Sequence, residues 1–145
     1  MQRINKLDIA DEFLEDAISL YLNEKKYFSA LHLAGAAQEI YGKTLRMDKE
    51  QNYSDFMLDQ VVKIFKKDGI EIDKKAVKKS EMHPKNTIKH INNKKDSFAT
   101  LNPQLDSCSK ILEAIMDHAF LKRKETSCIE TFKEYFMKTQ DTGML

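Results

Sequence analysis

The chain has 145 residues, of which 41% are hydrophobic and 32% charged, which suits one soluble globular domain and excludes wholesale disorder. No apolar run is long enough to cross a membrane, and the amphipathic, acidic N-terminal segment lacks the apolar centre of a signal peptide. The two cysteines, Cys108 and Cys128, fit reduced thiols better than a disulfide framework, so we expect a cytoplasmic protein with no membrane partner.

The positive charge of the chain is concentrated in one segment. The net charge is +1, but residues 66–95 hold ten lysines against four acidic residues, so this segment is basic and the remainder acidic. A local basic stripe can bind phosphates. A solvated lysine-rich loop and helix face has the same composition, so both interpretations stay open at this point.

Apolar residues recur at helical spacing along the whole chain, and no segment shows the alternation of a strand. We therefore predict an all-α protein, an antiparallel bundle of five to six helices, with Asp8 as the N-cap of the first helix. The expected helices cover, in chain order, about residues 8–25, 27–46, 52–67, 84–92, 103–124 and 127–139. We expect a single domain over residues 1–145, with a frayed tail from about residue 140.

Capping residues and prolines set several of these boundaries. Asn52 or Ser54 is the expected N-cap of the third helix. Residues 70–82 fit either a short helix capped by Asp73 or a linking segment. Pro84 suits the first turn of a helix and not its interior, which places the start of the fourth helix there.

The second expected helix, YFSALHLAGAAQEIYGKTLR, is apolar around most of its surface and rich in small residues. Such a helix belongs at the centre of a bundle, because small side chains let neighbouring helices approach closely. Gly35 and Gly42 are seven residues apart and lie on its polar side. They indicate close packing there, for which a dimer interface is one setting.

A narrow polar stripe on the same helix contains His32, Glu39 and Lys43. Glu39 and Lys43 are four residues apart, in the order that favours an ion pair. One interpretation is a satisfied salt bridge beside a buried histidine. The other is that the stripe faces the basic segment HPKNTIKH, residues 83–90, and supports a functional site.

The segment YFSALHLAGAAQEIYGK followed by KNTIKH resembles a family of small bacterial proteins with no established activity. In that family a Ser-Ala-Leu-His-Leu-Ala-Gly-Ala-Ala-Glu-Glu type helix precedes an Ala-Lys-Asn-Ala-Ile-Lys-His type segment. The likeness covers roughly residues 5–125. The family is in turn similar to the HEPN superfamily of helical-bundle domains, many of which are dimeric, metal-independent ribonucleases, while others only bind nucleotides or partners. The resemblance implies an HEPN-like fold, a homodimer, RNA or a nucleotide as ligand, and no cofactor.

The HEPN ribonuclease motif is an arginine followed after four to six residues by a histidine, often with a polar residue directly after the arginine. In this chain Lys85 stands in the arginine position, Asn86 in the polar position and His90 in the histidine position. The resemblance therefore implies catalytic roles for these three residues. Asn86 and His90 are four residues apart, so we expect them to share a helix face.

Some HEPN domains also carry Glu-x-x-x-Lys-Arg on an earlier helix. The glutamate and lysine of that pattern are present here, whereas Thr44 replaces its arginine. The expected binding residues are Glu39, Lys43, His32, His83 and Lys89. No metal is expected, because no spacing of histidines and cysteines resembles a zinc site.

The function indicated first is an RNA- or nucleotide-directed, metal-independent ribonuclease-like domain. Attack of the RNA 2′-hydroxyl on its own phosphate needs a group that moves protons near neutral pH, and histidine does so. It also needs a cation that stabilises charge on the phosphate oxygens. The alternative is a non-enzymatic nucleotide-binding or protein-interaction bundle, so the sequence leaves open whether the protein is an enzyme. A close approach of His90 to the His90 of a second copy across a cleft favours the first function, and His90 buried away from any cleft favours the second.

Overall fold

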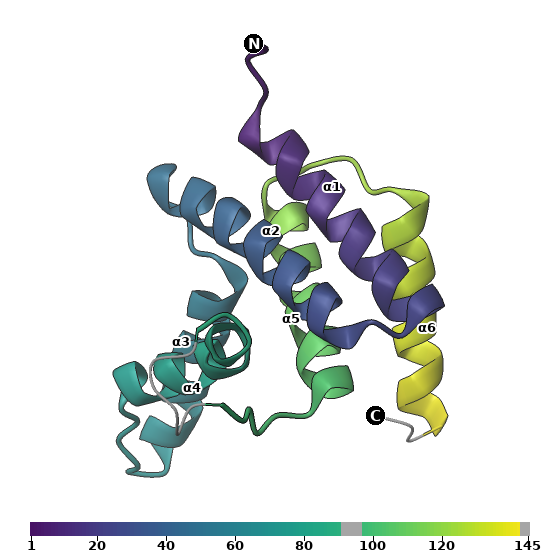
Figure 1. The fold of residues 1–145 in the computed structure, drawn as a ribbon. Helices are drawn as coiled ribbons and strands as arrows, with labels where there is room; N and C mark the ends of the chain where they lie inside the picture. The colour runs from purple at the N-terminus through teal and green to yellow at the C-terminus, as the bar shows by residue number, and fades with distance from the viewer. Residues whose placement is uncertain (91–96, 143–145) are drawn as a thin grey trace.

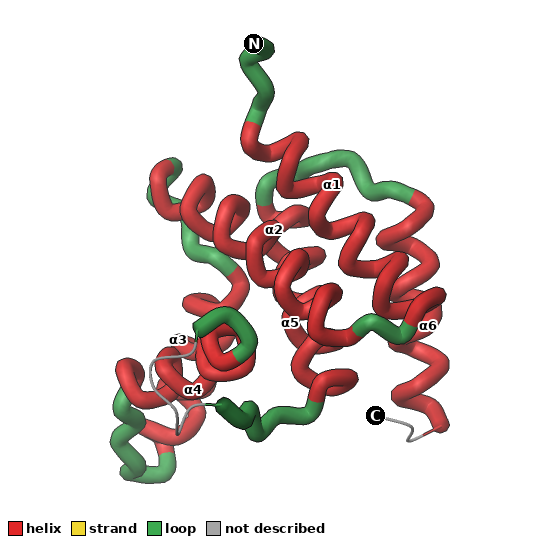
Figure 2. The backbone as a smooth tube through the Cα atoms, in the orientation of Figure 1, coloured by secondary structure: helices red, strands yellow, loops and turns green. Residues whose placement is uncertain are grey.

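The computed structural model describes residues 1–90 and 97–142, apart from the side chains of His83 and Thr142. The described part is helical and contains no strand, so the predicted all-α class is confirmed (Figure 2). Its elements are α1 (Lys6–Ser19), the π-helical segment η1 (Leu20–Glu24), α2 (Tyr27–Met47), α3 (Tyr53–Lys67), α4 (Lys74–Thr87), α5 (Pro103–Phe120) and α6 (Ser127–Thr142). No helix in these described ranges is long and apolar enough to span a membrane.

The helices form two unequal groups. Helices α1, α2, α5 and α6 pack into a bundle, in which α2 has its most extensive contacts with α5 and α1 (Figure 1). Helices α3 and α4 form an arm beside this bundle and contact it less extensively (Figure 1). The position of α2 at the centre of the molecule agrees with its apolar and small side chains.

The apolar core lies inside the bundle. Ala30, Ala34 and Ala37 of α2 are fully buried, so α1 and α5 can lie close to its backbone. At the end of the bundle where η1 meets α6, the ring of Tyr21 packs edge-on against Phe132, with ring centres 5.6 Å apart. Such edge-to-face pairs add to the stabilisation that comes from burying both rings.

The first helix begins earlier than its sequence pattern predicts. The N-cap is Asn5, whose side-chain oxygen accepts a hydrogen bond from the Leu7 N–H at 3.0 Å. Asp8, the predicted cap, lies in the first turn, where a carboxylate still interacts favourably with the helix dipole. The helical path ends at Lys25 as predicted, where the backbone is left-handed with φ of 56°, although its last turn is a π-helix.

The third helix has the predicted boundaries. Asn52 is its N-cap and accepts a hydrogen bond from the Asp55 N–H at 2.8 Å, so Ser54 is not the cap. The helix ends at Lys67, and Gly69 follows with φ of 75°, a conformation that glycine adopts without a steric cost.

The fourth helix departs most from its prediction. It begins at Lys74, capped by Asp73, which accepts hydrogen bonds from two backbone N–H groups of the first turn. Pro84 lies in its last turn, so the predicted start at Pro84 is wrong. A proline near the end of a helix removes one backbone hydrogen bond, and the favourable cap and helix-forming residues before it outweigh that loss. The position of His83 directly before Pro84 favours an extended backbone, but His83 is helical in the structure.

The last two helices start where the sequence predicts and end elsewhere. Asn102 caps α5, but that helix ends at Phe120 and not near Lys124. Helix α6 begins at Ser127 and continues to Thr142, into the segment for which we predicted fraying. Residues 143–145 and the expected end of the fourth helix at residues 92–93 lie outside the described residues.

Candidate functional site: a polar cavity between α2, α4 and α5

A cavity of about 430 Å³ lies where α2, α4 and α5 face one another beside the first turn of α3. Its charged lining residues are Glu39, Lys43, Arg46, Asp55, Lys78, Glu81, Lys85, Lys89, Lys110 and Glu113. Six of these side chains are cationic and four are carboxylates, so the lining carries an excess of positive charge. Asn86 and His90 also line the cavity.

The cavity brings together residues that are far apart in the sequence. All three residues of the expected catalytic motif line it, and so do Glu39 and Lys43 of the α2 stripe, together with Lys89. His90 lies beyond the end of α4 at Thr87, so the expectation that it shares a helix face with Asn86 is wrong. Because the chain turns after Thr87, the position of His90 relative to Lys85 is not set by helical spacing.

Lys85 crosses the surface of α2 and reaches Glu39. Its ammonium nitrogen lies 2.9 Å from Glu39 Oε2, and only 7% of its side chain is exposed. Its methylene groups lie over Gly35, where an added Cβ would be 2.9 Å from Lys85 Cδ. The close packing indicated by Gly35 is therefore contact with α4 of the same chain.

Glu39 is shared between two lysines. It accepts hydrogen bonds from Lys43 at 2.8 Å and from Lys85 at 2.9 Å. These bonds and the charge of Lys85 lower the pKa of Glu39 to about 2, so this carboxylate is ionised at neutral pH. One negative charge between two positive charges leaves one positive charge in excess.

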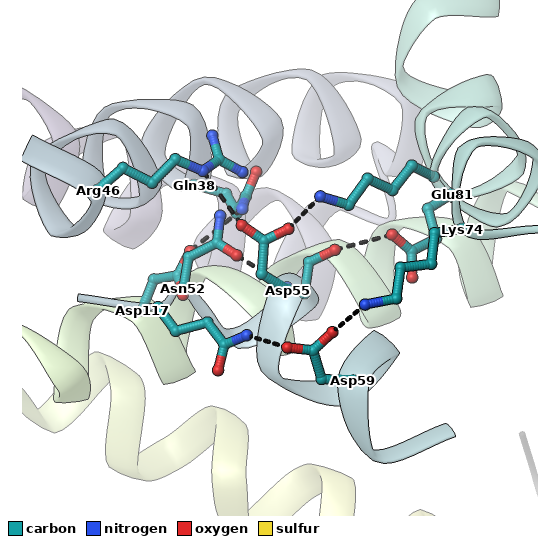
Figure 3. A network of polar contacts seen from close by, with 11 residues as sticks. Gln38, Arg46, Asn52, Asp55, Asp59, Lys74, Glu81 and Asp117 are labelled. Carbon is teal, nitrogen blue, oxygen red and sulfur yellow. Dashed lines mark hydrogen bonds and ion pairs between the residues drawn. The ribbon is translucent and has the colours of Figure 1, made fainter. Parts of the chain in front are cut away.

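Asp55, at the start of α3, has the same arrangement (Figure 3). Arg46 Nε donates to Asp55 Oδ2 at 3.2 Å, and Lys78 forms an ion pair with Oδ1. Burial acts to raise the pKa of Asp55, but the hydrogen bonds from Lys78 and Arg46 outweigh it and lower the pKa. A second group of two cations and one carboxylate thus lines the same cavity.

Three further residues contribute groups that form no ion pair with another described residue. Lys89 forms no ion pair with any described residue, and burial, followed by the charge of Lys85, lowers its pKa. Asn86 and His90 are exposed. This part of the cavity therefore offers a cation, an amide and an imidazole to a ligand.

Asp117 anchors the arm to the bundle beneath the cavity (Figure 3). It is fully buried and accepts hydrogen bonds from the Tyr53 N–H at 2.6 Å and from Gln38 Nε2 at 3.1 Å. Burial raises its pKa. Gly42 leaves room for the side chains of Asn52 and Asp117, since an added Cβ would lie 2.9 Å from Asn52 Nδ2 and 3.4 Å from Asp117 Oδ2. Sequence reasoning missed this anchor, whose local signal is that Asp117 follows Lys110 and Glu113 at helical spacing on one face of α5.

Lys110 and Glu113 form a second polar feature that the sequence did not indicate. Their charged groups are 2.5 Å apart, and only 9% and 21% of their side chains are exposed. Burial raises the pKa of Glu113, and the neighbouring lysine opposes that rise. The pair therefore adds little net charge to the part of the cavity wall that α5 forms.

Two of the expected binding residues are not part of this cavity. His32 is exposed and lies in a separate shallow hollow with Phe28 and Ile88, so a buried histidine on the α2 stripe is not observed. Partial burial, followed by the charges of Lys89 and Lys85, lowers its pKa. The side chain of His83 lies outside the described residues. The described buried histidine is His118, which packs against Tyr41 in the bundle.

Within residues 1–90 and 97–142, no group of three or more histidine, cysteine, aspartate or glutamate side chains is arranged to hold a metal ion. No known protein family, curated protein or solved structure matches the chain.

Proposed function

We propose that this protein is an RNA-directed, HEPN-like domain and that RNA phosphates bind in the polar cavity. The observation that carries the proposal is the sharing of single carboxylates between two cations, at Glu39 and again at Asp55. Each group keeps one uncompensated positive charge and Lys89 adds another, and with Glu81 included the lining holds six cations against four carboxylates. A cavity with this charge attracts a polyanion, and backbone phosphates supply most of the affinity in nucleic-acid binding.

In the proposed reaction His90 removes the proton from the RNA 2′-hydroxyl. The resulting oxygen attacks the adjacent phosphorus, and the bond to the 5′-oxygen breaks as the protonated His90 returns its proton to that oxygen. The products carry a 2′,3′-cyclic phosphate and a 5′-hydroxyl. Lys85 and Lys89 stabilise the negative charge that develops on the phosphate oxygens. Asn86 orients the ribose or the phosphate. No metal or cofactor has a role in this scheme.

A second candidate is a non-enzymatic domain that binds RNA or a nucleotide without cleaving it. The ion pair between Lys85 and Glu39 favours it, because the lysine in the arginine position of the motif is already engaged within the chain. Lysine also lacks the bidentate grip of arginine on a phosphate. His90 lines a cavity and is exposed, so it does not have the buried position away from any cleft that we expected for the second candidate.

We also propose that the working form is a homodimer in the cytoplasm. Ile64, Phe65 and Ile70 are exposed apolar residues on the arm, which supports association through this surface. Sedimentation analysis of the wild type and of Ile64→Lys tests this, and a monomeric wild type would contradict it.

Binding of a fluorescently labelled single-stranded RNA tests the proposed function. Lys89→Ala is expected to weaken binding several-fold and to reduce the salt dependence by about one phosphate contact. Lys79→Ala is the matched control, because this exposed lysine lies on α4 and does not line the cavity. Equal losses in both variants would mean that the general basicity of α4, and not the cavity, binds RNA.

A further inference from the structure

A second cavity adjoins the polar one on the other side of the Glu39–Lys43 pair. It has a volume of about 540 Å³ and lies between the start of α1, α2 and Lys89. Its apolar lining residues are Leu7 of α1 and Ala36, Ile40 and Met47 of α2. We call it the α1–α2 groove.

The α1–α2 groove and the polar cavity share three residues. Glu39, Lys43 and Lys89 line both, so the ion pair on α2 forms a ridge between them. A ligand bound to Lys43 or Lys89 can therefore extend into either hollow.

The two hollows differ in chemistry. The polar cavity is surrounded by charged groups, whereas Leu7, Ala36, Ile40 and Met47 give the groove an apolar surface. The side chain of Met47 is largely exposed, at 75%. Methionine is flexible and polarizable, and it makes favourable contacts with aromatic rings. An apolar hollow beside two lysines fits a molecule that has a flat apolar part joined to an anionic part.

We propose that the α1–α2 groove holds the base of the RNA nucleotide whose phosphate is bound by Lys43 and Lys89. This inference rests on the proposed function, because it needs RNA phosphate at the shared ridge. The argument for this occupant is charge complementarity together with the three shared residues. A base covers apolar surface with its flat face while the ribose keeps the phosphate at the lysines. The groove would thus add affinity for bases to a phosphate-binding site that is itself indifferent to them.

Comparison of RNA with an abasic ribose-phosphate chain of the same length tests this inference. We expect the wild type to bind RNA about tenfold more tightly, the factor expected when roughly 60 Å² of apolar surface leaves water. In Ala36→Phe the new ring fills the groove, so RNA should bind only as tightly as the abasic chain, with abasic binding unchanged. Met47→Ser should reduce the preference for RNA without affecting folding, because its side chain is exposed.

The controls separate the two proposals. Lys89→Ala should weaken RNA and the abasic chain alike, since it removes a phosphate contact. Equal binding of both chains by the wild type would overturn the base subsite and leave the phosphate site standing. Failure of the wild type to bind either chain would overturn both. A preference for RNA that persists in both groove variants would mean that the base binds outside the groove. If Ala36→Phe does not fold, the loss or retention of the RNA preference in Met47→Ser tests the base subsite.

Discussion

The two sides of α2 take part in two different kinds of packing. On one side Ala30, Ala34 and Ala37 are buried against α1 and α5 in an apolar core. On the other side Glu39 meets Lys85 and Arg46 meets Asp55, both from the arm. Burial of apolar surface stabilises the first side, whereas ion pairs in which one partner is about half exposed, as Glu39 and Arg46 are, stabilise the second only weakly.

The bundle and the arm therefore have different roles. The bundle provides the stability of the fold, and the arm provides Lys85, Asn86, Lys89 and His90 for the cavity. Among the described residues of the arm, Leu58 is the one buried apolar side chain, and a region with few buried apolar contacts opens at a lower free energy than a packed core. We therefore expect substitutions in the bundle to unfold the whole protein and substitutions beneath the arm to release the arm alone.

The largest effect is expected in the bundle core. Phe132→Ala removes a fully buried ring that packs against Tyr21. We expect a loss of about 3–5 kcal/mol in the free energy of unfolding, because the substitution leaves a cavity. Urea denaturation followed by circular dichroism measures this. A loss below about 1 kcal/mol would mean that this end of the core is loosely packed.

A smaller and local effect is expected at the anchor of the arm. Asp117→Ala removes the acceptor for the Tyr53 N–H and for Gln38, at a cost of about 1–3 kcal/mol. Hydrogen exchange should increase in α3 and α4 and stay unchanged in α1. Asp117→Asn is the control, because its amide oxygen still accepts from Tyr53. Uniformly faster exchange across the chain would contradict separate behaviour of the arm.

The two glycines on the polar side of α2 provide a matched pair. In Gly42→Ala the new Cβ would lie 2.9 Å from the buried side chain of Asn52, so we expect a loss of about 1–3 kcal/mol. In Gly35→Ala the contact is with the flexible side chain of Lys85, and alanine gains up to about 1 kcal/mol in helix propensity. The midpoint temperature of thermal unfolding should therefore be much lower in Gly42→Ala than in Gly35→Ala. The reverse order would refute the assigned packing.

The smallest effect is expected from the ion pairs of Glu39. Its pKa falls from 4.5 to about 2 on folding, so the ionised group stabilises the folded state above pH 4.5. That contribution is lost as the pH falls from 4.5 toward 2. Because Glu39 is about half exposed, it amounts to at most about 1 kcal/mol. The difference in the free energy of unfolding between the wild type and Glu39→Gln should therefore disappear as the pH falls through this range. A difference that does not change with pH would contradict the assigned role of the Glu39 ion pairs.

The sequence predicted the parts of the molecule that depend on local pattern. Its periodicity predicted the full length of α2 to within one residue, and it offered Asn52 and Ser54 as caps of α3, of which Asn52 is the cap. Local rules failed at α4, where the steric rule for Pro84 was given more weight than the cap at Asp73.

The candidate site was predictable only in part. The motif and the stripe pointed to residues that the cavity brings together, including Lys85 and Glu39. Asp117 and the sharing of Asp55 between Arg46 and Lys78 were not predictable, because these contacts join residues distant in the sequence. Such contacts are set by the packing of whole helices, which no local pattern contains.

The most direct test of the central claim, that His90 cleaves RNA bound in the cavity, is RNA cleavage in EDTA. The wild type should produce ends with 2′,3′-cyclic phosphates, and folded His90→Ala should produce none. His32→Ala is the matched control, because this exposed histidine lies outside the polar cavity, and it should cleave as the wild type does. Intact RNA after incubation with folded wild type at high protein concentration would contradict the claim.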